Sequence, residues 1–316
     1  MDPQVVSVGI TQMANGFGFR VVRWRRPGVA ALRELDARAC SRGVRGVPVA
    51  IVEALAAVRP LVQIPASAPR PSASQTMIFE RGPQRPLCPG LQLQNYDADV
   101  RAGLIAADRM EVGTLGMTLE RGGETLIVSN HHVLAGHGHG LLGDRIAQPG
   151  GATLREGEVI ATLERAVELL PSATNAHPMR GDVIWNRVDA AAARLRRGVA
   201  WQAEFMDHHR LPRLGKLASP VIGEEVFKVG RTTGLRRGRI ASVRDRVGPI
   251  GYGVGPVWFR GSFTVEGLRG RSFSEPGDSG AIVVRRSGEV LGMIYAGNGV
   301  QTYACPITDV FDELGY

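Results

Sequence analysis

The chain has 316 residues and a formal net charge of +8, which comes from 38 basic and 30 acidic side chains. This length allows one large domain, or a medium domain with a smaller companion, and either can bury a core without disulfides or metals. The basic residues occur in short bursts rather than in one stripe interleaved with aromatic residues, a pattern that argues against a nucleic-acid groove.

Cysteine usage and hydrophobic runs indicate the compartment. Cys40, Cys88 and Cys305 are widely spaced and odd in number, so we expect neither a disulfide framework nor a cysteine zinc site. The first residues lack the basic segment and apolar run of a secretion signal, and no stretch is apolar for long enough to span a bilayer. These features predict a cytoplasmic protein that does not associate with membranes.

Residues 1–57 are predicted to form a small α+β unit. Two extended runs, "VVSVGI" and "FGFRVVRW", precede a segment with helical spacing of apolar residues, "GVAALRELDARAC", and then the apolar run "VPVAIV". This β-β-α-β unit is too short to bury much core by itself, so we expect it to dock on another surface. Residues 58–90 are rich in proline, alanine and serine, and this composition predicts a semi-extended linker.

Residues 91–316 are predicted to form an all-β domain. Short β-type runs broken by glycines recur from "EVGTLGMTLE" to "VLGMIYAG", which is typical of barrels and sandwiches. The last segment, "PITDVFDELGY", predicts a terminal helix, because Ile307, Val310, Phe311 and Leu314 fall on one helical face.

The stretch "SEPGDSGAI" at residues 274–282 contains a candidate nucleophile, Ser279, within a turn-forming sequence. A serine nucleophile needs a base, a carboxylate that orients the base, and amide donors for the developing oxyanion. The backbone N–H groups of Gly277 and Ser279 could converge as these donors if Gly277 adopts a conformation that other residues avoid.

Histidines suited to the role of base follow the strand-like run "TLIV". His131 and His132 come directly after it, and one of the two is expected to point inward. His137 and His139 follow closely, so a metal-binding cluster of the four histidines is an alternative. None of them forms an "HExxH" pattern, and we therefore expect neither a metal nor a cofactor.

Two aspartates compete for the orienting role in "RGDVIWNRVDAAAARL". Asp189 fits better than Asp182, because the four alanines after Asp189 leave room for its burial against an imidazole, whereas bulky residues follow Asp182.

Taken together, "SNHHVLAG", "NRVDAAAARL" and "PGDSGAIVV" resemble the motifs of the trypsin-like, chymotrypsin-fold serine peptidases. The segment "VFKVGRTTGLRRGRI" is similar to the "GRTTG" segment of the alpha-lytic protease and streptogrisin branch, and "GDRIAQPG" and "ACPITDVFDELG" resemble other bacterial members. The resemblance covers roughly residues 88–316. It implies two β-barrels, at about 91–200 and about 220–306, and a helix at 307–316.

The resemblance also implies residue roles. His132 becomes the general base, Asp189 the orienting carboxylate and Ser279 the nucleophile, with the Gly277 and Ser279 amides as the oxyanion hole. Arg231 of "GRTTG" would pair with Asp278, which has a physical motive of its own, since a buried aspartate needs a partner. Secreted relatives carry cysteines where this chain has Val133, Phe227 and Arg237, which agrees with the cytoplasmic expectation.

The resemblance places Phe273, six residues before the nucleophile, at the base of the primary specificity pocket, with Ser274 beside it. No carboxylate is present there to receive Arg or Lys, so we expect a small or apolar residue before the scissile bond. The run from Tyr295 to Gly297 would offer main-chain hydrogen bonds to an extended peptide.

The sequence thus predicts a regulated serine endopeptidase that acts on proteins or peptides. Its amino-terminal unit could also contact a regulatory protein partner. The alternative is a catalytically latent protease fold that serves as a binding or scaffold module in signalling or defence.

Overall fold

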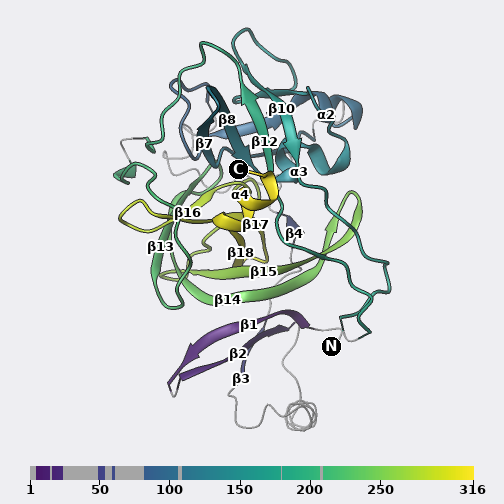
Figure 1. Ribbon diagram of the computed structural model, residues 1–316, viewed down its shortest axis with the longest axis vertical. Helices are drawn as coiled ribbons and strands as arrows, with labels where there is room; N and C mark the ends of the chain where they lie inside the picture. Colours follow the sequence, from purple (N-terminus) through teal and green to yellow (C-terminus); the bar gives the residue numbers. More distant parts are fainter. Residues whose placement is uncertain are drawn as a thin grey trace.

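The computed structural model describes residues 5–14, 16–23, 49–53, 59–60, 82–105, 109–178, 180–206 and 209–316. Strands dominate these residues, and two β-sheets contain them (Figure 1). No helix within the described ranges is both long and apolar enough to cross a bilayer. The all-β fold class predicted from the sequence is confirmed.

The first sheet is antiparallel and has seven strands in the order β6-β5-β9-β10-β12-β8-β7. Three short helical segments, α2, α3 and η2, connect its strands. The bounds are β5 (Gln92–Asn95), α2 (Tyr96–Arg101), β6 (Val112–Thr114), β7 (Met117–Arg121), β8 (Glu124–Ser129), α3 (His131–Leu134), η2 (Gly136–Gly138), β9 (Arg145–Ala147), β10 (Val159–Ala166) and β12 (Ala191–Leu195).

The second sheet has eleven strands, and the pairing of β14 with β15 closes β15, β18, β17, β16, β13 and β14 into a ring. Helix α4 follows β18 and buries Ile307, Val310 and Leu314, as the apolar spacing predicted. The bounds are β11 (Trp185–Asn186), β13 (Glu225–Gly230), β14 (Gly234–Tyr252), β15 (Gly255–Gly267), β16 (Ile282–Val284), β17 (Val290–Gly297), β18 (Gln301–Pro306) and α4 (Ile307–Leu314).

The amino-terminal strands extend the second sheet. They are β1 (Val5–Met13), β2 (Gly16–Arg23) and β3 (Val49–Glu53), and β1 pairs antiparallel with β14 (Figure 1). The expected helix at residues 28–40 lies outside the described residues. A two-residue strand, β4 (Arg59–Pro60), belongs to the predicted linker and pairs with β17.

Two hydrophobic cores meet where the sheets approach each other. Alternate residues of a strand point to opposite faces, so Ala191 and Ala193 of β12 pack in the core of the first sheet. Ala192, between them, packs in a cluster that also contains Phe227 and Tyr295 of the second sheet. This shared cluster joins the two sheets, and the candidate catalytic side chains lie along the same junction.

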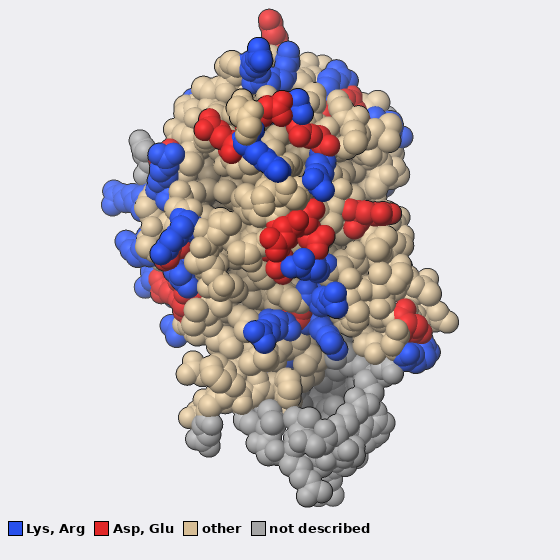
Figure 2. Space-filling model, in the orientation of Figure 1, with Lys and Arg blue, Asp and Glu red and all other residues tan. Residues whose placement is uncertain are grey.

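Charged residues are interspersed on the face of the molecule that Figure 2 shows, where acidic and basic groups lie near one another over several elements. Cys88 and Cys305 are buried, and Cys40 lies outside the described residues.

Candidate active site

His132 and Asp189 meet because their strands are neighbours. Strand β8 pairs antiparallel with β12, with Ser129 opposite Ala191. His132 follows the end of β8, on α3, and Asp189 precedes the start of β12, so the register brings them together. The Nδ1 atom of His132 lies 2.5 Å from Oδ2 of Asp189, and both side chains are fully buried.

The carboxylate of Asp189 is held by further donors. Its Oδ1 accepts the backbone N–H of His132 at 3.2 Å, and its Oδ2 accepts the hydroxyl of Tyr252 at 2.8 Å. Burial by itself raises the pKa of Asp189, but the charge and hydrogen bond of His132, together with the hydroxyl of Tyr252, outweigh it and hold that pKa below its ordinary value. Asp189 is therefore an ionised carboxylate that fixes the imidazole.

Two rings flank the imidazole of His132. The ring centroid of His137 lies 5.3 Å from that of His132, and the ring of Tyr252 stands edge-on at 5.8 Å. Burial, with the charge of His132, lowers the pKa of His137 to about 3, so His137 is neutral at physiological pH. These rings shield His132 from water, and its Nε2 atom is buried without a hydrogen-bond partner in the described part of the chain.

Ser279 lies in a tight turn that requires glycine on both sides. Gly277 has φ of 100° and Gly280 has φ of 91°. A Cβ atom at Gly277 would lie 2.3 Å from Oγ1 of Thr232, and one at Gly280 would lie 2.1 Å from Oγ of Ser129. Both positions combine a left-handed backbone with close neighbours, which explains the "GDSG" spacing.

Hydrogen bonds from both sheets fix this turn. The backbone N–H of Thr114, in the first sheet, donates to the carbonyl of Ser279 at 2.8 Å. The hydroxyl of Ser279 is fully buried and donates to the carbonyl of Tyr295 at 3.3 Å. A Cβ atom on Gly113 would lie 2.3 Å from Val133 and 3.1 Å from the carbonyl of Ser279, so the residue after His132 and the candidate nucleophile flank one glycine.

The amides expected to form the oxyanion hole are uncommitted. Within the described residues, the N–H groups of Gly277 and Ser279 donate no hydrogen bond to a backbone carbonyl, whereas the N–H groups of Asp278 and Gly280 donate to Glu275 and Ile294. Two free donors on alternate residues of one turn are what an oxyanion needs.

The expected pairing of Asp278 with Arg231 is corrected. The ammonium of Lys228 binds Asp278 at 2.8 Å, and both side chains are fully buried. The Asp278 carboxylate also accepts the hydroxyl of Thr233 and the backbone N–H groups of Thr232, Thr233 and Glu275. Five donors thus already surround this carboxylate.

Arg231 instead reaches the first sheet. Its guanidinium donates to Oε1 of Gln92 at 3.0 Å and 2.5 Å, and its backbone N–H donates to Oγ1 of Thr114. Burial raises the pKa of Asp278, yet the charge and hydrogen bond of Lys228 outweigh it and bring that pKa below its ordinary value. Sequence reasoning missed Lys228, although a lysine within the apolar strand "EVFKVG" is itself an unusual signal.

The residues expected to bind substrate are mostly enclosed. Phe273 is fully buried and packs in a core cluster with Phe263 and Val265. The hydroxyl of Ser274 lies 2.6 Å from that of Thr302. The side chain of Tyr295 is fully buried. Gly297 ends β17, where β4 pairs with it.

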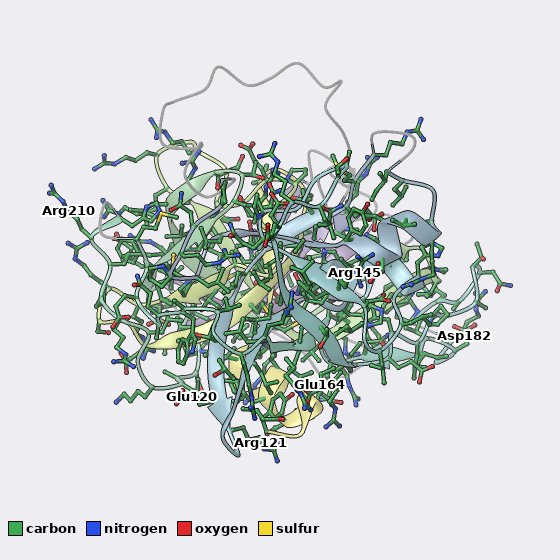
Figure 3. All side chains as sticks on the ribbon, turned by 90° about the horizontal axis from the view of Figure 1, so that it is seen from above. Glu120, Arg121, Arg145, Glu164, Asp182 and Arg210 are labelled. Atoms are coloured by element: carbon green, nitrogen blue, oxygen red, sulfur yellow. The ribbon has the colours of Figure 1, made fainter. Side chains whose placement is uncertain are left out.

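The competing candidates lie elsewhere. Nδ1 of His131 contacts the carbonyl of Val167 at 2.8 Å, whereas the carboxylate of Asp189 is hydrogen-bonded to His132. Asp182 lies at the periphery (Figure 3), where its carboxylate accepts the backbone N–H of His177 and the guanidinium of Arg180. No group of His, Cys, Asp and Glu side chains in the described ranges is arranged to hold a metal ion.

A pair of acidic residues borders the site. The carboxylate of Glu111 lies 3.8 Å from Nε2 of His137, and the backbone N–H of Glu111 donates to Asp99. Burial, with the charge of Asp99, raises the pKa of Glu111 to about 8, and burial raises the pKa of Asp99 to about 6. Glu111 is therefore protonated over much of the neutral range, so it places no negative charge beside His137.

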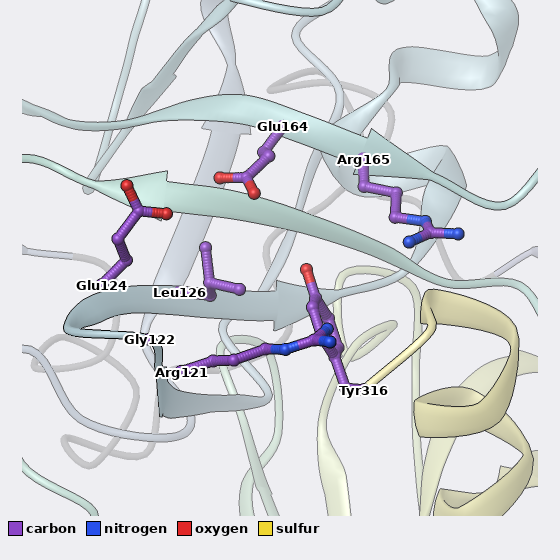
Figure 4. Close-up of a pocket in the computed structure, with 7 residues that line it drawn as sticks. All are labelled: Arg121, Gly122, Glu124, Leu126, Glu164, Arg165 and Tyr316. Carbon is purple, nitrogen blue, oxygen red and sulfur yellow. The ribbon is translucent and has the colours of Figure 1, made fainter.

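A surface pocket of about 480 Å³ lies away from these residues, between the first sheet and the carboxyl terminus (Figure 4). Arg121, Glu124, Glu164, Arg165 and Tyr316 line it, and Arg194 bridges the two glutamates. None of His132, Asp189 and Ser279 contributes to it.

Neither the protein-family models nor the curated proteins match this chain. Among solved structures, it is similar to Nocardiopsis protease (16% identity, TM-score 0.48, 72% of this chain and 96% of that one) and to Thermobifida fusca protease A (17%, 0.43, 65% and 89%). It is also similar to Cellulomonas bogoriensis chymotrypsin (18%, 0.42, 64% and 87%).

Proposed function

We propose that this protein is a serine endopeptidase in which His132, Asp189 and Ser279 form the catalytic triad. The observation that carries the proposal is the buried hydrogen bond between the Asp189 carboxylate and His132, at the same sheet junction as a serine in a glycine-flanked turn. This combination supplies a base, its orienting carboxylate and a nucleophile.

The proposed reaction proceeds through an acyl-enzyme. Nε2 of His132 takes the proton from the hydroxyl of Ser279 as its oxygen attacks the peptide carbonyl carbon. The carbonyl oxygen becomes an oxyanion, which the N–H groups of Gly277 and Ser279 stabilise. His132 then donates the proton to the departing amine, and a water molecule, activated in the same way, hydrolyses the ester.

Asp189 has an electrostatic role in this scheme. Its hydrogen bond to Nδ1 fixes the tautomer that leaves Nε2 free to accept a proton, and its charge stabilises the imidazolium that forms. Lys228 and Thr233 hold Asp278, and this keeps the turn that presents Ser279 and its two amides in place.

In the described arrangement, the hydroxyl of Ser279 and Nε2 of His132 are not hydrogen-bonded to each other. The hydroxyl of Ser279 points to the carbonyl of Tyr295, while Nε2 of His132 has no partner within the described residues. Turning χ1 of Ser279 between staggered positions would redirect its hydroxyl. The same observation favours the second candidate, a catalytically latent binding module, because the pair is not engaged.

Finer properties belong to the same proposal. Substrates would be proteins or peptides with a small or apolar residue before the scissile bond, since Phe273 provides no charge. The small number and wide spacing of the cysteines, with a buried free thiol at Cys305, support a reducing, cytoplasmic location. The division into a unit at 1–57, a linker at 58–90 and a protease domain at 91–316, with a regulatory partner for the unit, is proposed from the sequence pattern.

A fluorophosphonate probe tests the proposal, because it labels only activated serines. We expect labelling of the full chain, loss of labelling in Ser279→Ala and in His132→Ala, and unchanged labelling in Ser287→Ala, whose hydroxyl is exposed in a distant turn. Absence of labelling in the full chain and in a version with residues 1–81 removed would favour the latent module instead.

A further inference from the structure

The edge of β17 beside the candidate nucleophile carries a strand from this chain's own amino-terminal region. Strand β4 pairs antiparallel with β17, with Pro60 opposite Ala296 and Arg59 opposite Gly297 (Figure 1). The residue before this pairing, Tyr295, provides the carbonyl that accepts the hydroxyl of Ser279. The paired edge therefore begins one residue from the atom that contacts the nucleophile.

The chemistry of the paired residues suits recognition of main chain. Pro60 has no N–H, so of the two pairs only Arg59 and Gly297 can exchange both hydrogen bonds. Proline is tolerated in a strand at such an edge position. Main-chain pairing on an exposed edge is how extended peptides add to a sheet, with affinity that does not require a particular side chain.

The direction of β4 is that of a substrate. β17 runs from Val290 to Gly297, and an antiparallel strand opposite it advances from Gly297 toward Tyr295. The chain thus approaches the hydroxyl of Ser279 in its amino-to-carboxyl direction, as the acyl portion of a peptide must. Leu61, the next residue in sequence, lies outside the described residues.

The amino-terminal strands anchor this segment near the edge. β1 pairs with β14. The hydroxyl of Ser7 lies 3.2 Å from that of Tyr303, and the hydroxyl of Thr11 donates to the carbonyl of Ala241 at 2.6 Å. Only five residues separate Glu53, the end of β3, from Arg59. A short tether gives the segment a high effective concentration at the edge.

The side chains of Ser279 and His132 are fully buried. A peptide carbonyl reaches them only if part of the chain moves.

We propose that the segment containing Arg59 and Pro60 occupies in cis the edge of β17 at Ala296–Gly297, with which an extended peptide substrate would otherwise pair. The inference rests on the proposed function in naming the site's ligand as a peptide substrate. An external peptide must then compete with β4, so this pairing lowers the affinity of the full chain for peptide substrates.

The substitution Arg59→Pro tests occupancy, because it removes the N–H that pairs with Gly297 and leaves β17 unchanged. Arg59 is exposed, so we expect the fold to persist, which urea unfolding checks. Arg70→Pro, in another Arg-Pro dipeptide that lies outside the described residues, is the matched control. All chains carry Ser279→Ala, so that no cleavage occurs and binding is read directly.

The probe is the fluorescein-labelled peptide Ala-Val-Arg-Pro-Leu-amide, which copies residues 57–61, and its affinity is measured by anisotropy. We expect Arg59→Pro to bind it about tenfold or more tightly than the unsubstituted chain, and Arg70→Pro to bind like the latter. Hydrogen exchange of residues 295–298 should accelerate in Arg59→Pro alone. Equal affinities together with unchanged exchange would overturn the proposal.

Labelling separates this result from the fate of the proposed function. With Ser279 restored, failure of a fluorophosphonate to label the Arg59→Pro chain contradicts the serine peptidase. The anisotropy and exchange data decide strand occupancy in either case, because they do not depend on catalysis.

Discussion

Replacing Lys228 by methionine is expected to destabilise the fold and disable the site together. The ammonium of Lys228 and the carboxylate of Asp278 are both fully buried at 2.8 Å. Removing one partner of a buried ion pair leaves an uncompensated charge, which costs about 3–5 kcal/mol. Four hydrogen-bond donors remain on Asp278, so we expect the lower end, about 3 kcal/mol.

Urea unfolding measures this loss, and the chain provides a matched control. Lys216 is the only other lysine, its side chain is 80% exposed, and its nearest acidic partner is Glu289 at 3.5 Å. Lys216→Met should change the free energy of unfolding by less than about 0.5 kcal/mol. Arg231→Met, which removes hydrogen bonds to Gln92, should cost about 1–2 kcal/mol.

A double-mutant cycle isolates the pair. Asp278→Asn removes the charge that Lys228→Met leaves behind, so the double variant should be more stable than the sum of the single losses by about 2 kcal/mol. Labelling of Ser279 should fall sharply in Lys228→Met at a urea concentration where the chain is folded. A loss below about 1 kcal/mol, or a smaller loss than in Arg231→Met, would refute the assignment of Lys228 as the partner of Asp278.

Two further predictions concern the surroundings of the imidazole. Tyr252→Phe removes a hydrogen-bond donor to Asp189, so we expect labelling of Ser279 to slow about tenfold. The low-field proton resonance of His132 Nδ1–H should also move. An unmoved resonance would contradict the role of Tyr252 as a donor to Asp189. Because burial raises the folded-state pKa of Glu111 from 4.5 to about 8, the folded chain favours the protonated form, and its stability is lost as pH rises between these values. The free energy of unfolding of Glu111→Gln, measured with urea, should therefore rise by about 2 kcal/mol relative to that of the wild type between pH 5 and 8.5. This is below the full limit of about 5 kcal/mol, because water reaches the group. Parallel pH profiles of the two free energies of unfolding would refute this.

The pairing of His132 with Asp189 was accessible from sequence for a specific reason. Both residues flank strands whose apolar runs are legible, and the alanines after Asp189 indicated space for a buried imidazole. Asp182 precedes bulky residues and lies at the periphery, as that reasoning implied. Local sequence therefore predicted Asp189 and a histidine at position 131 or 132, and the resemblance to the trypsin-like peptidases selected His132.

The partners that come from distant elements were not accessible in this way. Tyr252 reaches Asp189 from the end of the long strand β14, 63 positions along the chain, and Lys228 reaches Asp278 across 50 positions. The tertiary arrangement selects these contacts, and a tyrosine before a glycine carries no signal of them. The strand pairing of Arg59 with Gly297 is equally non-local, because the proline-rich composition around it indicates only a linker.

The buried polar groups favour catalysis over a purely structural role for this fold. Burying a carboxylate against an imidazole is costly compared with apolar packing, so stability does not explain the pair of His132 and Asp189. Nε2 of His132 adds to this, because a buried nitrogen without a partner in the described residues costs about 1–3 kcal/mol. Such departures from stable packing concentrate at functional sites. An imidazole with one nitrogen fixed by a carboxylate and the other free is configured to accept a proton, and in this chain the hydroxyl of Ser279 is the donor we propose for it.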